Sequence, residues 1–139
     1  MIRLLTNSDF LDVLPLNLEM HRCINASVNS VGATATLIND IMTKNDCIII
    51  GLFDDVSNKL IGFTSGYGME KNIFYFSGIY VIIKNNDKTK KLIDFSFDYI
   101  KQMGYTSWEV DTRNENISSI MEKYGAKKVY TRYHKDFNA

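Results

Sequence analysis

A polar turn between a strand and a helix holds the residue types in this chain that are best suited to chemistry. It consists of Lys84, Asn85, Asn86, Asp87, Lys88 and Thr89. A helix that begins directly after a strand aims unpaired backbone N–H groups, and the positive end of its dipole, at whatever lies above the turn. Phosphate groups often occupy such a place. The order of elements therefore favours a ligand that resembles a nucleotide.

The two cysteines indicate neither a disulfide nor a metal centre. Cys23 and Cys47 lie in apolar contexts, without CxxC spacing and without clustered histidines. Buried thiols in a reducing compartment fit this pattern better than a disulfide or a metal site. We therefore predict no metal.

Strand and helix patterns predict how the turn is positioned. Six strands are expected, over residues 2–5, 47–53, 60–67, 73–83, 108–111 and 129–133. Four helices are expected. The first carries Phe10, Leu11, Leu14 and Leu18, and Pro15 should kink or split it. The second follows a loop over 25–32 and has Leu37, Ile38, Ile41 and Met42 on an apolar face, and the last two span 88–103 and 114–124. Short connections predict an antiparallel meander over 47–83. The alternation of strands and helices that follows requires parallel or crossover pairing.

Composition limits the class of protein. The 139 residues, 45% of them hydrophobic, fit a single domain over 1–139. Lys+Arg 16 balances Asp+Glu 16, and this lack of net charge disfavours general electrostatic binding of nucleic acid. No apolar run is long enough to cross a bilayer and the first residues lack a signal-peptide pattern, so we expect a soluble cytoplasmic protein.

The order of elements resembles the GNAT superfamily of acyl-CoA N-acyltransferases over nearly the whole chain. This resemblance implies an α/β fold with a mixed sheet flanked by about four helices. It also implies acetyl-CoA as cofactor and transfer of its acetyl group to a primary amine. In that family the strand before the long helix splays from its neighbour at a bulge, and the cofactor lies along the exposed edge. Gly78 is typical of such a bulge, although a glycine there could also let a neighbouring side chain approach.

The resemblance also implies residues that would bind the cofactor. They are the strand residues Ile79, Tyr80 and Val81, the turn residues Lys84, Asn85, Asn86, Asp87, Lys88 and Thr89, and Asn114 at the start of the last helix. The turn departs from the family pattern, since Asp87 and Thr89 stand where glycines usually let backbone N–H groups approach the pyrophosphate. Asp87 would either repel phosphate or act as an N-cap for the helix.

The catalytic positions depart from the family as well. The tyrosine that usually protonates the leaving thiolate would stand at Met121, so Tyr124, one turn away, is either an acid or a core aromatic. Glu19 and His21 lie in the helical region that helps to line the acceptor side, and either is a possible general base.

Two further functions stay open. The segment 114–126 is similar to short GNAT-like proteins of tailed bacteriophages, which implies a degenerate, catalytically inactive member that serves as a structural or interaction component of a virion. It would then be found in the host cytoplasm or in the particle, with protein partners there. An inhibitor that docks through an exposed strand edge is the third interpretation.

Overall fold

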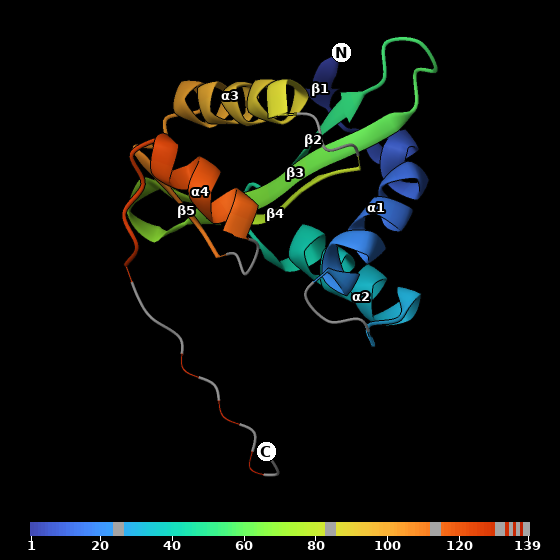
Figure 1. The fold of residues 1–139 in the computed structure, drawn as a ribbon, viewed down its shortest axis with the longest axis horizontal. Coiled ribbons are helices and arrows are strands. Elements are labelled where there is room, and N and C mark those ends of the chain that lie inside the picture. Colours follow the sequence, from blue (N-terminus) through green and yellow to red (C-terminus); the bar gives the residue numbers. More distant parts are fainter. Residues whose placement is uncertain are drawn as a thin grey trace.

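A mixed sheet runs through the middle of the molecule (Figure 1). The computed structural model describes residues 1–23, 27–82, 86–111, 115–129, 133, 135 and 137. Its strands are β1 (Ile2–Leu4), β2 (Ile48–Phe53), β3 (Leu60–Met69), β4 (Ile73–Val81) and β5 (Ser107–Val110). They lie in chain order, with β1 to β4 antiparallel and β5 parallel to β4. The predicted meander and the parallel pairing after it are both confirmed.

Helices cover both faces of the sheet (Figure 1). They are α1 (Phe10–Arg22), α2 (Ser30–Thr43), α3 (Asn86–Gln102) and α4 (Glu115–Lys123). Helices α1 and α2 pack together on one face, where α1 contacts β3 and β4, and α3 packs over β2 and β3 on the other face. The α/β fold predicted from the sequence, a mixed sheet flanked by about four helices, is confirmed.

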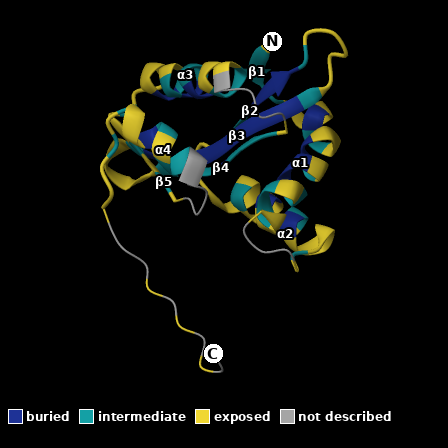
Figure 2. Ribbon diagram, in the orientation of Figure 1, coloured by how far each residue is buried: buried dark blue, intermediate teal, exposed yellow. Residues whose placement is uncertain are grey.

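A cluster of buried residues lies on the face of the sheet under α3, and buried residues run along the central strands (Figure 2). Phe74 and Phe76 of β4 pack there against Ile100, and all three are at most 3% exposed. One polar contact is enclosed in this apolar layer: Thr64 Oγ1 and Ser96 Oγ lie 2.8 Å apart. Ser96 Oγ also lies 2.8 Å from the Leu92 carbonyl oxygen, so neither hydroxyl is left unsatisfied.

The opposite face carries α1, which is tied to its neighbours at two points. Arg3 donates two hydrogen bonds to Asp9, of 2.8 and 2.9 Å, directly before α1 begins. This guanidinium, together with the backbone N–H of Thr6, holds the pKa of Asp9 well below its usual value. Further along, the buried Asn17 donates from Nδ2 to the Ala33 carbonyl oxygen at 2.9 Å, which joins α1 to α2.

The helices differ from the expectations in two details. Of the two outcomes expected at Pro15, a kink or a split, the split is wrong, because α1 continues through this residue. Helix α2 begins at Ser30, inside the expected loop, because the Asn29 side chain accepts a hydrogen bond from Gly32 N at 2.9 Å and caps the helix.

The buried faces of these helices also differ from the prediction. Leu11 and Met42, both expected on apolar faces, are 76% and 79% exposed, whereas Val13, which was not expected there, is 1% exposed. Leu37 is buried as expected. Helix α2 packs mainly on α1, so only a narrow stripe of its apolar residues finds a partner.

The expected strand over residues 129–133 was wrong at both of its ends. Val129 and Tyr133 have no strand conformation and are 77% and 91% exposed, while residues 130–132 lie outside the described residues. Hydrophobic side chains alone do not make a strand when no neighbouring strand pairs with them.

Candidate active site

Strand β4 is longer than its neighbour β5, whose four described residues all pair with the first half of β4. The two strands pair only from Ile73 opposite Ser107 to Phe76 opposite Val110, and β4 then continues to Val81 without β5 beside it. A bulge lies at the point of separation, since Ser65 pairs with Gly78 and Gly66 with Phe76, which leaves Ser77 as the extra residue. The bulge expected at Gly78 is confirmed, and bulges bend and twist the strand that carries them.

Gly78 also permits a close approach. A Cβ atom there would lie 2.8 Å from Met20 Sδ of α1. Both interpretations of this glycine therefore hold, and the bulge brings α1 directly over β4.

Beyond Phe76, the edge of β4 that faces away from β3 has no paired strand among the described residues, and this free edge presents main-chain groups. Ile82 N donates to Ile61 O at 2.7 Å, which fixes the direction of N–H groups along this strand. Because these directions alternate along a strand, Ile79 and Val81 direct their N–H groups away from β3, whereas Tyr80 directs its own toward β3. An extended amide-containing chain such as pantetheine fits against an edge of this kind. The residues present thus match an acyl-CoA ligand in hydrogen-bonding type.

Helix α3 begins beyond this edge, and its first turn is only partly described. Lys84, Asn85 and Asn114 lie outside the described residues, as does the side chain of Asn86. Asp87 is exposed in the first turn, where a negative charge suits the helix dipole, and Thr89 is half-buried.

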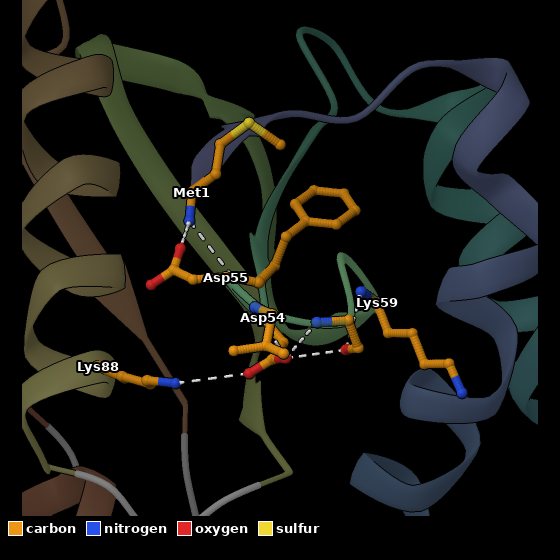
Figure 3. Close-up of polar contacts among 8 residues, drawn as sticks. Met1, Asp54, Asp55, Lys59 and Lys88 are labelled. Atoms are coloured by element: carbon orange, nitrogen blue, oxygen red, sulfur yellow. Dashed lines mark hydrogen bonds and ion pairs between the residues drawn. The ribbon is translucent and has the colours of Figure 1, made fainter.

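Lys88, in this same turn, pairs with the β2–β3 hairpin (Figure 3). Its Nζ lies 3.8 Å from Asp54 Oδ1. Asp54 also accepts hydrogen bonds from Ser57 N at 2.8 Å and Ser57 Oγ at 2.9 Å, and these bonds keep its pKa below the usual value. A phosphate group bound by Lys88 would therefore compete with a carboxylate of this chain.

A pocket of about 230 Å³ lies on the other side of β4 from α3. It is lined by Asn17, Met20 and His21 of α1, Thr36, Leu37 and Asp40 of α2, Ser65 and Tyr67 of β3, and Tyr75 and Ser77 of β4. Ser65 Oγ and Ser77 Oγ lie 3.1 Å apart, beside the bulge. The pocket therefore adjoins the point at which the pairing of β4 with β5 ends.

Of the two predicted bases, the structure places one in this pocket. His21 lines it, and burial lowers the pKa of this imidazole while the nearby Asp40 partly offsets that effect. The neutral form, which can accept a proton, is therefore favoured near pH 7. Glu19 is exposed instead, with Oε1 3.5 Å from Arg22 Nη1, and it does not line the pocket.

Tyr124 is engaged on the α3 side of the sheet. Its hydroxyl donates to Asp94, and its ring meets Phe97 edge-on with 5.1 Å between centroids. Burial and the Asp94 carboxylate raise the pKa of Tyr124 above its ordinary value, which makes the phenol a weaker acid. Met121, at the family's tyrosine position, is 4% exposed and belongs to the core. These contacts favour the core-aromatic interpretation of Tyr124.

Several pocket residues were missed by the sequence reasoning. Ser65 and Tyr67 alternate on β3 as Tyr75 and Ser77 do on β4, and this polar alternation on neighbouring strands was a usable signal. Asp40 had no such signal, because its place in the pocket depends on how α2 packs against α1.

Two absences apply to the described part of the chain only. Within it, no group of three or more His, Cys, Asp or Glu side chains is placed to hold a metal ion. None of its helices combines the length and the apolar character needed to cross a membrane.

Comparison with known proteins gives a result at the level of structure and none at the level of sequence. No family model and no curated protein sequence matches the chain. A solved structure of a probable acetyltransferase superposes with a TM-score of 0.74 at 18% identity, covering 98% of this chain and 99% of that chain. The ribosomal-protein-alanine N-acetyltransferase of Brucella melitensis biovar Abortus 2308 gives 0.73 at 19% identity, with 99% of each chain covered.

A plant enzyme shows the same likeness. Glucosamine-6-phosphate N-acetyltransferase of Arabidopsis thaliana gives a TM-score of 0.65 at 20% identity, covering 99% of this chain and 97% of that chain. A GNAT family acetyltransferase of Staphylococcus aureus subsp. aureus USA300_TCH1516 gives 0.66 at 16% identity, with 99% and 98% covered. The chain therefore has the fold of the GNAT acetyltransferases.

Proposed function

We propose that this protein is an N-acetyltransferase that moves the acetyl group of acetyl-CoA to a primary amine. The observation that carries the proposal is the free edge of β4 beside a pocket that contains His21. Such an edge offers hydrogen bonds to a thioester carrier, and the pocket offers space for an amine with a base next to it.

The chemistry needs few side chains. Acetyl-CoA supplies an acetyl group activated as a thioester. The N–H groups of Ile79 and Val81 are the donors available to hold this carrier along β4. His21 takes the proton that the amine nitrogen loses as its bond to the acetyl carbon forms and the carbon–sulfur bond breaks. Direct attack of this kind depends on proximity and on a polarised carbonyl group, so no protein nucleophile is required.

The nucleotide end of the cofactor is assigned to the start of α3. Lys88 and Thr89, with Asn86 and Asp87, form the first turn of that helix. We assign Lys84, Asn85 and Asn114 to the same role. On binding, Lys88 would give up its ion pair with Asp54 and form one with a phosphate group, so one charge-assisted contact replaces another.

Calorimetric titration with acetyl-CoA, combined with an assay for released CoA thiol in the presence of amines, tests the proposal. We expect binding, and thiol release that requires an amine. The absence of heat or thermal shift at millimolar ligand would overturn it.

Two variants and one smaller ligand make this test specific to the site. Lys88→Gln should weaken the binding of acetyl-CoA severalfold. It should leave the binding of S-acetylpantetheine, which lacks the nucleotide, unchanged. Asp54→Asn should strengthen acetyl-CoA binding, because it removes the carboxylate that competes with phosphate. Lys101→Gln, an exposed lysine at the far end of α3, is the matched control for Lys88→Gln.

A second candidate is a catalytically inactive structural or interaction component, such as part of a bacteriophage virion. It is supported by Tyr124 and Lys88, whose side chains are already engaged by Asp94 and Asp54. Mass spectrometry of purified particles tests it: presence in the particle, together with no acetyl-CoA binding, is the expected result, and absence from the particle contradicts it.

A further inference from the structure

We propose that the acceptor is a short aliphatic diamine, with its reacting nitrogen beside His21 and its second, protonated nitrogen bound by Asp40 against Tyr67 and Tyr75. The role of the reacting nitrogen rests on the proposed function. Binding of the second nitrogen does not, because it depends only on the pocket.

The Asp40 carboxylate is suited to bind a cation. It lines the pocket from α2 and is half-buried. Among the described residues, no hydrogen bond or ion pair engages its side-chain oxygens. Burial raises the pKa of Asp40, which means that the charged form has lost part of its hydration. An ammonium group in the pocket would replace the lost water with a charge-assisted hydrogen bond.

Two tyrosine rings complete this cation site. The centroids of Tyr67 and Tyr75 lie 5.3 Å apart, with the ring planes tilted by 51°. The Tyr75 hydroxyl donates to Asp111 Oδ2 at 3.0 Å, which brings a second carboxylate close to the rings. Burial, and after it the charges of Asp40 and other acidic groups including Asp111, raise the pKa of Tyr67. Aromatic faces and negative charge both attract ammonium.

The chain's own Lys44 shows that such an attraction operates here. Its Nζ lies 5.2 Å from the centroid of the Tyr67 ring. Lys44 is exposed and acts on the pKa of Asp40 only as a secondary influence, after burial, without forming an ion pair with it. A small dication can therefore compete with Lys44 for this wall of the pocket.

The size of the pocket favours a short molecule. A volume of about 230 Å³ corresponds to roughly eight water molecules at about 30 Å³ each. A short aliphatic chain fits such a space, whereas larger acceptors would remain mostly outside it. The hydroxyls of Ser65 and Ser77, beside the bulge, can accept hydrogen bonds from the nitrogen that is to react.

The test compares 1,4-diaminobutane with 4-aminobutan-1-ol, which replaces one ammonium with a neutral hydroxyl. Binding is measured by calorimetry without acetyl-CoA, and acetylation is measured with it. We expect the diamine to bind and to react roughly tenfold better or more, as charged hydrogen bonds usually allow. Asp40→Asn should abolish this preference. Asp12→Asn, an exposed position on α1 outside the pocket, should preserve it.

The outcomes separate the two proposals. Acetylation of both amines at equal rates would overturn the diamine inference and leave the acetyltransferase intact. Diamine binding that depends on Asp40 but occurs without any acetyl-CoA binding would support the cation site at Asp40 and overturn both the enzyme and the diamine's role as acceptor. A diamine preference that persists in Asp40→Asn would refute the role of Asp40. Tighter diamine binding by Lys44→Gln would support the cation site.

Discussion

The two faces of β4 differ sharply in character although they belong to one nine-residue strand. Toward α3, Phe74 and Phe76 are at most 2% exposed and pack among other aromatic rings. Toward α1 and α2, Tyr75 and Ser77 line a polar pocket. One face is closed by packing, whereas the other keeps hydroxyl groups beside an open space.

This difference shows how the strand combines stability with chemistry. Burial of the phenylalanines holds β4 in place without using any polar group. The alternate residues are thus released from a packing role and can present hydroxyls to a ligand. The predictions below test whether the two roles are as separate as the geometry indicates.

Loss of an aromatic ring from the packed face should have the largest effect on stability. Phe76→Ala is expected to lower the free energy of unfolding by about 3–5 kcal/mol, the usual range for a buried phenylalanine. Denaturant unfolding followed by fluorescence measures this change. A loss below about 1 kcal/mol would show that the α3 face does not hold β4.

Removal of the imidazole from the pocket face should affect activity. His21→Gln is expected to lower kcat roughly hundredfold, about 2.7 kcal/mol, as general bases commonly contribute. Because burial lowers the pKa of His21, the wild-type rate should rise with pH through a value below the ordinary 6.5 and then level off, with Asp40 as the neighbouring charge. The variant should lack this rise. An unchanged pH profile would exclude His21 as the base.

The glycines on either side of the bulge should respond differently. A Cβ at Gly66 would overlap the Tyr75 carbonyl oxygen and the Phe74 ring, whereas at Gly78 it would meet the end of the Met20 side chain and the Ser65 hydroxyl. Gly66→Ala should therefore cost about 1–3 kcal/mol of unfolding free energy, and Gly78→Ala less. Thermal unfolding of both variants measures the difference. Equal losses of unfolding free energy would mean that the two faces of the sheet tolerate an added methyl group equally well.

The smallest effect is expected from a hydroxyl on the pocket face. Ser77→Ala should change the unfolding free energy by about 1 kcal/mol or less, because its bond to Ser65 is only partly buried. A double-mutant cycle with Ser65→Ala isolates this contact. A coupling energy as large as the loss of unfolding free energy in Phe76→Ala would show that the pocket face of β4 contributes as much to stability as the packed face.

Local patterns explain what the sequence could predict. A glycine in a strand otherwise rich in aromatic residues predicted the bulge at Gly78, and short connections predicted the meander. Apolar spacing was less informative for α2, where Met42 fits the periodicity but has no partner. Periodicity identifies the face that could be buried and does not say how much of it a neighbour covers.

The candidate site could be predicted only in part. The resemblance implied the edge residues Ile79, Tyr80 and Val81, and His21 was one of two possible bases. Asp40 enters the pocket because Asn17 holds α2 against α1, a contact between helices that no local pattern reveals. The assignments to Lys84, Asn85 and Asn114 stay predictions.

The Arg3–Asp9 pair has a consequence for any acid titration of the molecule. A carboxyl group with a lowered folded-state pKa stabilises the fold above its unfolded value of about 3.9, and this contribution disappears only as the pH falls through the lower folded value. The Arg3–Asp9 ion pair, which joins β1 to the beginning of α1, should consequently persist under mild acidification. Changes in rate between pH 5 and 7 would then report proton exchange inside the pocket rather than displacement of the helix that carries His21.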